Sequence, residues 1–184
     1  MAAARSCAVG LLLALLHAAD APCPGEAERR HLVEETLRSL LTLGPRLPDE
    51  CLQDAVNFKI SFRPKMVRKL SSYKQAMKLS SQLLAEDVSL VQWDPSKLRS
   101  LQELLGRQTK FFTDCQKNKA LKQAKRKKME KYFQELRDFL TKESHRPCAW
   151  ELVRAEMEQL FTTLRKSHFN SSVKDKQSKK LKQI

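Results

Sequence analysis

The sequence of 184 residues contains little glycine and no long apolar run. Glycine occurs only four times, which disfavours glycine-rich β architectures and loops that cradle phosphate groups. The longest apolar segment, Cys7 to Ala19, has 13 residues, fewer than the roughly 20 that cross a bilayer. Nucleophile-elbow, zinc-protease and CxxC motifs are also missing, and the four histidines are scattered singly. We therefore expect neither an enzyme nor a metal or cofactor site.

The N-terminus has the order typical of a secretory signal peptide. Arg5 supplies a positive start, the apolar run from Cys7 to Ala19 follows, and small residues come next. Cleavage after Ala19 or Ala21 makes residues 1–21 the signal peptide. The sequence thus predicts a secreted, extracellular protein with no transmembrane segment in its mature form.

Basic residues outnumber acidic ones by 35 to 21, which gives a net charge of +14. Residues 117–131 hold eight Lys or Arg and one acid, and residues 165–182 hold seven and one. From His168 onward the chain has too few large apolar residues to offset its ordering entropy. We predict one domain over residues 22–167 and a basic, flexible tail over residues 168–184. The tail contains the sequon Asn170-Ser171-Ser172, which predicts glycosylation of Asn170.

The first basic segment predicts a polyanion site on a helix. Its residues span more than one helical face, which suits heparan sulfate or anionic lipid: Lys122, Lys125, Arg126, Lys127 and Lys128. A solvated helix start is the equally weighted alternative. No aromatic side chain alternates with these charges before Tyr132, so we do not expect a nucleic-acid partner.

Apolar residues recur at three- and four-residue steps in five segments, and no comparable strand-like alternation competes. The five predicted helices cover residues 26–43, 65–84, 95–115, 120–142 and a segment that starts near Pro147 and reaches at least Leu164. The first is expected to bury Val33, Leu37, Leu40 and Leu41. Asp94 is the expected N-cap of the third, with Pro95 at its first position.

The connections predict an all-α, five-helix bundle: a four-helix up-up-down-down core plus one extra helix, with two disulfides. Short links favour antiparallel neighbours, whereas the long link after the first helix allows a parallel crossover. The resulting order is up, up, down, up, down. Signal removal leaves four cysteines, and this topology places Cys23 with Cys115 at one end and Cys51 with Cys148 at the other. We predict these two pairs, because bridged Cα atoms lie about 5 to 6 Å apart.

Residues Cys148 to Met157 (CAWELVRAEM) resemble the signature at the start of the last helix of the type I interferons. The segment from Lys131 to Glu143, followed by Pro147-Cys148, is similar to the fourth helix of that family and its link to the fifth. Cys51-Leu52 lies 28 residues after Cys23, which is also the family's spacing. The resemblance covers the whole predicted secreted part.

The resemblance implies an antiviral cytokine that brings together two different receptor chains, whose Janus kinases then activate STAT transcription factors. Its high-affinity face would comprise the first helix, the long loop and the last helix, with contacts at Leu52, Arg154 and Ala155. Leu52 could equally be a core residue beside the disulfide. Arg154 follows Val153 by about 100° around the helix, so we expect it on the surface, whereas Trp150 is expected in the core.

Two positions depart from the family pattern. Ala55 stands four positions after Cys51, where the family often has a basic residue, and Glu130 stands where a basic contact to the low-affinity chain is common. A second receptor face is expected on the second to fourth helices. The alternative function is a cationic host-defence protein that binds glycosaminoglycans or membranes. Another class of helical cytokine suits the fold but not the Cys148 motif.

Overall fold

The computed structural model describes residues 25–44, 47–63, 70–115 and 123–181, and within these ranges it contains helices and no strand. Five long helices form the bundle: α2 (Glu26–Leu43), α4 (Leu70–Leu83), α5 (Pro95–Cys115), α6 (Gln123–Lys142) and α7 (Pro147–Leu181). The all-α prediction is confirmed. Residues 65–69 and 120–122, which we assigned to helix starts, lie outside the described residues.

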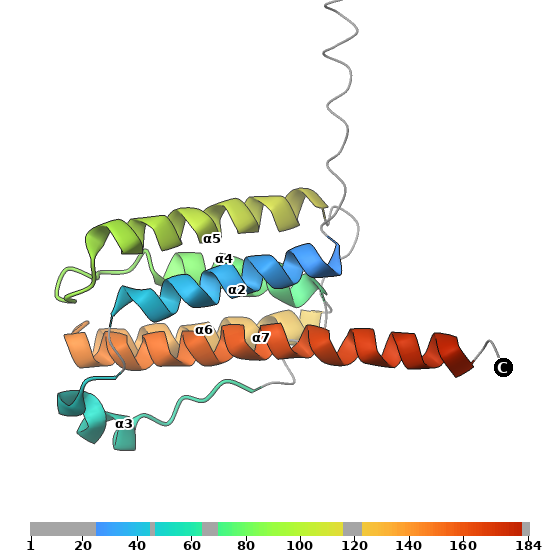
Figure 1. Ribbon diagram of the computed structural model, residues 1–184. Coiled ribbons are helices and arrows are strands. Elements are labelled where there is room, and N and C mark those ends of the chain that lie inside the picture. The colour runs from blue at the N-terminus through green and yellow to red at the C-terminus, as the bar shows by residue number, and fades with distance from the viewer. Residues whose placement is uncertain (1–24, 45–46, 64–69, 116–122, 182–184) are drawn as a thin grey trace, which may run out of the picture.

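The helices run in the predicted directions. In Figure 1, α2, α4 and α6 run one way along the bundle, and α5 and α7 run the other way. Helix α4 packs against α5 and α6, while α2 packs against α7 and α5. The long connection after α2 carries the chain to the parallel α4, as the crossover argument requires.

The core is formed by the apolar stripes of the five helices. Their largest fully buried side chains include Trp150, Tyr73, Phe112, Phe133, Phe161, Leu40 and Met77. A polar contact crosses this interior, where the Thr36 hydroxyl donates to Gln108 Oε1 at 3.1 Å and Gln108 Nε2 donates to the Leu32 carbonyl at 3.0 Å. These bonds fix the register of α2 against α5, because a shift would leave buried polar groups unpaired.

The start of α5 and the burial at the end of α2 test two finer predictions. Asp94 caps α5 as predicted, since its Oδ1 accepts from the backbone N–H groups of Ser96 at 2.8 Å and Lys97 at 3.2 Å. Leu41 was wrongly placed in the core: it is 54% exposed, and Leu43 is buried at the end of α2 instead. The apolar stripe drifts around α2 toward its end, because 3.6 residues per turn do not repeat evenly.

Helix α7 is longer than its apolar pattern predicted. Its backbone is helical to Leu181, and Figure 1 shows it extending beyond the other helices. After Pro147 the chain contains neither proline nor glycine, and nothing in its local propensity stops the helix. The flexibility and boundary of the predicted tail remain a prediction. Within the described residues, no helix has the length and apolarity needed to cross a membrane.

A Schellman motif turns the chain from α6 into α7. The His145 N–H donates to the Leu140 carbonyl at 2.8 Å, and the Ser144 N–H donates to the Thr141 carbonyl at 3.1 Å. Ser144 has φ 50° and His145 has φ 53°, both in the left-handed region. This region favours glycine, so a serine at the first of these positions costs stability.

We predict that Ser144→Gly raises the free energy of unfolding by about 1 kcal/mol, because glycine adopts the left-handed conformation without strain. Ser100→Gly is the matched control: Ser100 is exposed within α5, where glycine should lower stability by roughly 0.5 kcal/mol. Urea unfolding of both variants measures the two values. If both substitutions raised the free energy of unfolding, or both lowered it, the assignment of the Schellman motif would be contradicted.

Candidate receptor-binding site

The long connection after α2 is attached to the start of α7 by a disulfide. It contains a short 3-10 helix, η1 (Asp49–Cys51), followed at once by α3 (Leu52–Asn57). Cys51 is bonded to Cys148 across 97 positions of sequence, with Cα atoms 5.2 Å apart. This predicted pair is confirmed. Cys23 lies outside the described residues, so its pairing with Cys115 stays a prediction.

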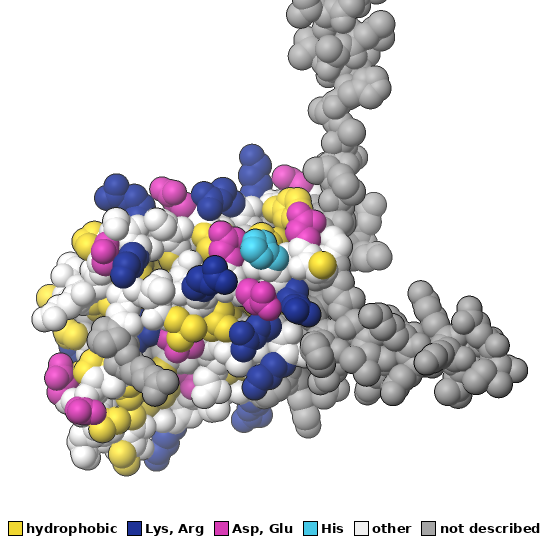
Figure 2. All heavy atoms as spheres, in the orientation of Figure 1, with side chains coloured by type: hydrophobic (Ala, Val, Ile, Leu, Met, Phe, Trp, Pro, Cys, Tyr) yellow, Lys and Arg dark blue, Asp and Glu magenta, His cyan; other side chains and the backbone are white. Residues whose placement is uncertain are grey.

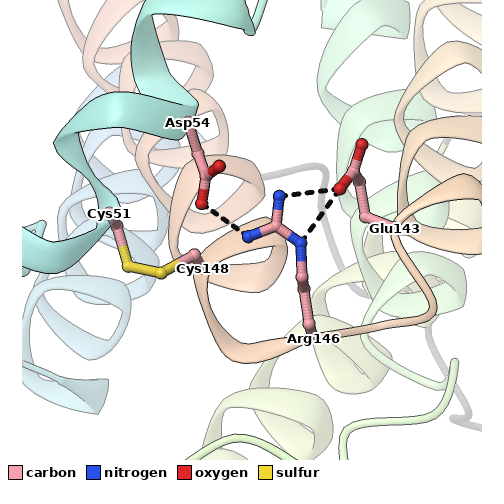
Figure 3. Close-up of polar contacts among 5 residues, drawn as sticks. All are labelled: Cys51, Asp54, Glu143, Arg146 and Cys148. Carbon is pink, nitrogen blue, oxygen red and sulfur yellow. Dashed lines mark hydrogen bonds and ion pairs between the residues drawn. A yellow bond between two sulfur atoms is a disulfide. The ribbon is translucent and has the colours of Figure 1, made fainter.

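Arg146 makes a second attachment beside the disulfide (Figure 3). Its guanidinium donates to Asp54 of α3 at 2.5 Å and to Glu143, just after α6, at 2.7 and 2.9 Å. One cation therefore links α3 to the turn between α6 and α7. The hydrogen bond from Arg146 lowers the pKa of Asp54 below its ordinary value of 3.8.

Further along the described part of the connection, Phe58 and Phe62 lie against α6 and α7. The ring of Phe58 meets that of Phe139 edge-on at 4.8 Å, and Phe62 meets Tyr132 at 5.5 Å. The Phe62 N–H donates to Glu156 of α7 at 2.9 Å, and the Tyr132 hydroxyl donates to the same carboxylate oxygen at 3.2 Å. Burial raises the pKa of Glu156 despite these two donors. The connection is thus fixed at both ends of its described part.

Helix α3 presents two apolar side chains to solvent. Leu52 is 52% exposed and Val56 is 74% exposed, and they lie one helical turn apart. The alternative placement of Leu52 in the core is wrong, because Cys51 fills the buried position and directs its neighbour outward. Exposed apolar side chains on a short helix held by a disulfide and an ion pair form a preorganised contact surface.

Near its start, α7 has a run of residues that is buried on all sides. Each residue from Ala149 to Arg154 is less than 9% exposed. Trp150 lies in the core as predicted, with its ring edge-on to Trp93 at 5.7 Å and its Nε1 donating to the Asp87 carbonyl at 2.8 Å. Trp93 Nε1 in turn donates to Glu151 at 2.7 Å.

The expectation that Arg154 lies on the surface is wrong. Its side chain is 4% exposed and bonds Glu151 on the preceding turn at 2.7 and 2.8 Å and Glu158 on the following turn at 2.5 Å. The helical-wheel argument assumed a single buried stripe, whereas α7 packs against α2, α6, η1 and α3, and Trp93 bonds Glu151 one turn before Arg154. The carboxylates at i−3 and i+4 were the sequence signal for this internal pairing.

The other predicted α7 residue is partly accessible. Ala155 is half-buried, and Glu158, one turn further along, has a side chain 23% exposed. Partial burial raises the pKa of Glu158, against the opposing attraction of the Arg154 guanidinium. Sequence reasoning missed both Glu158 and Val56 as candidate contact residues.

The proposed polyanion residues are only partly described. Arg126, Lys127 and Lys128 are exposed at the start of α6, and Arg126 pairs with Glu130 at 3.4 Å. Lys122 lies outside the described residues, as do the side chains of Lys125 and Asn170. On the face formed by α2 and α7, Figure 2 shows basic and acidic side chains intermixed. The described residues favour a solvated helix start as much as a polyanion site.

The described residues form a helical bundle in which a disulfide and an ion pair anchor α3 beside the start of α7. Residues 26–168 match the sequence model of the protein family described as the interferon alpha/beta domain. The chain therefore belongs to the interferon alpha/beta family, which is a family of cytokines and not of enzymes.

Curated relatives agree with this assignment. The chain is 28% identical over 170 residues to bovine interferon alpha-B and to bovine interferon alpha-1. Each match covers 83% of this chain and 90% of the relative.

Solved structures show the same fold. Zebrafish interferon 2 matches with a TM-score of 0.62 and 22% identity over 74% of this chain and 96% of that one. Zebrafish interferon 1 matches with a TM-score of 0.57 and 18% identity, over 79% and 97%.

We predict that the ion pair between Asp54 and Arg146 stabilises the fold only above acidic pH. Because pairing lowers the folded-state pKa of Asp54, its contribution is fully present above the unfolded value of 3.8 and is lost as pH falls through the folded value. Urea unfolding of Asp54→Asn at several pH values should show a deficit against wild type at pH 7 that shrinks progressively as the pH falls below 3.8.

Arg146→Gln provides the control for that experiment. In this background Asp54→Asn should change stability little at pH 7, since its partner is already absent. A deficit that persisted unchanged at low pH, or that survived the loss of Arg146, would contradict the assignment.

Proposed function

We propose that this chain is a secreted interferon that binds two different receptor chains at the cell surface and thereby starts antiviral signalling through Janus kinases and STAT factors. Membership of the interferon alpha/beta family supports this function. The signal-like N-terminus and the disulfide support secretion, because disulfides form and persist in oxidising compartments.

The observation that carries the proposal is the exposed Leu52 on the anchored helix α3. The disulfide from Cys51 and the ion pair from Asp54 hold α3 beside the start of α7. An exposed leucine and valine fixed in this way can enter a receptor pocket without a large ordering cost. Ala155 would complete this high-affinity face on α7, and the second receptor chain would bind α4, α5 and α6.

The contact made by α3 should be mainly apolar. Ala55 supplies no charge where the family often has a basic residue. Its neighbour Val56 is even more exposed than Leu52. Apolar contacts weaken little with ionic strength, unlike exposed ion pairs. We infer that α3 provides affinity through Leu52 and Val56 and contributes little to electrostatic steering.

Leu52→Ala should weaken binding to the high-affinity receptor chain by about 30-fold, because a truncated hot-spot leucine leaves a receptor pocket unfilled. Leu90→Ala is the matched control, since Leu90 is 54% exposed in the segment between α4 and α5. Surface plasmon resonance with each receptor ectodomain separately, using purified mature protein, gives both values.

Equal losses from Leu52→Ala and Leu90→Ala would remove α3 from the site. If the mature wild-type protein bound neither receptor chain and induced no antiviral genes in responsive cells, the proposed function itself would be wrong.

A further inference from the structure

Arg154 is poorly placed to contact a receptor directly. Its side chain is 4% exposed, and its guanidinium already bonds two carboxylates of its own helix, those of Glu151 and Glu158. Turning it outward would leave both carboxylates without that cation in a partly dehydrated environment. Breaking a buried ion pair in this way is strongly unfavourable.

The network that contains Arg154 is fixed from the inside. Glu151 accepts from Trp93 Nε1 at 2.7 Å, and its other oxygen accepts from Arg154. Gly44, where α2 ends, approaches this point so closely that an added Cβ would lie 3.3 Å from Trp93 and 3.4 Å from Glu151. The indole, the carboxylate and the guanidinium therefore have little freedom to move.

Glu158 is the member of this network that reaches the surface. Its side chain is 23% exposed, against 10% for Glu151 and 4% for Arg154. It lies three positions after Ala155, so the two share one face of α7. Arg154 holds its Oε1 at 2.5 Å, and Oε2 is the second acceptor of this partly exposed carboxylate.

The charges of the network do not cancel. Arg154 contributes one positive charge, and Glu151 and Glu158 contribute one negative charge each. The cation is enclosed, whereas one carboxylate is at the surface. This part of α7 therefore presents an oriented hydrogen-bond acceptor and not a cation, which favours a basic or hydrogen-bond-donating group on the partner.

We propose that Glu158 is the polar contact of α7 with the high-affinity receptor chain, and that Arg154 is a positioning residue that holds its carboxylate in place. The partner group is a Lys or Arg side chain of the receptor ectodomain. This inference rests on the proposed function, because it assigns chemistry to the same binding face.

Glu158→Gln tests the contact with little change in shape. Equilibrium binding to the high-affinity ectodomain should weaken by about tenfold at low salt, and the association rate should become less sensitive to salt, because a presented charge is removed. Glu135→Gln is the matched control: Glu135 pairs with Lys131 at i,i−4 on α6, with a side chain 46% exposed. It should bind the same ectodomain as wild type does.

Arg154→Lys tests the positioning role, because lysine keeps the charge but cannot bond both carboxylates as a guanidinium does. It should weaken binding several-fold in the wild-type background and by less than twofold in the Glu158→Gln background. Near-UV circular dichroism, which reports on the packing of Trp93 and Trp150, should show that both variants keep the native fold.

Wild-type binding after Glu158→Gln, together with a full loss after Arg154→Lys in both backgrounds, would overturn the inference and make Arg154 the contact itself. Tighter binding after Glu158→Gln would also overturn it. Either result would leave the proposed function standing if wild type binds both receptor chains, whereas absence of wild-type binding would reject the function and not this assignment alone.

Discussion

Residues Ala149 to Arg154 of α7 are enclosed on every side, and hydrogen bonds from the segment between α4 and α5 reach two of them. Enclosure forces each polar group to find a partner, because an unpaired buried group costs about 1 to 3 kcal/mol. Trp150 bonds the chain before α5, Glu151 bonds Trp93, and Arg154 bonds two carboxylates. Cys148 adds a covalent link to the connection after α2. The position of α3, and therefore of Leu52, depends on this enclosed segment.

Much of the bundle could be predicted from the sequence because its signals are local or topological. The apolar period located the helices, Asp94 and Pro95 marked the start of α5, and linker lengths gave directions that place Cys51 near Cys148. Helix α3 was not predicted. Its six residues, with apolar Leu52, Ala55 and Val56, are too few to establish a helical period, and tertiary attachments hold the helix in place.

The candidate site was harder to predict, because burial in a bundle depends on several neighbours at once. The wheel position of Arg154 relative to Val153 indicated a surface residue, but its side chain is enclosed and only 4% exposed. Two leucines show the same limit. From the sequence, Leu52 could be a core residue or a contact residue, and Leu41 was expected in the core, yet both side chains are exposed. The packing of α3 against α7 determines the exposure of Leu52, and the rotation of the apolar stripe at the end of α2 determines that of Leu41.

The account claims that α3 and the exposed side of α7 form one receptor-binding surface. Hydrogen–deuterium exchange of the mature protein, alone and with the high-affinity receptor ectodomain, tests this claim most directly. It predicts slower exchange in Leu52–Asn57 and in α7 from Ala155 onward, with α5 unchanged. Unchanged exchange in α3, with protection confined to α4, α5 or α6, would contradict it.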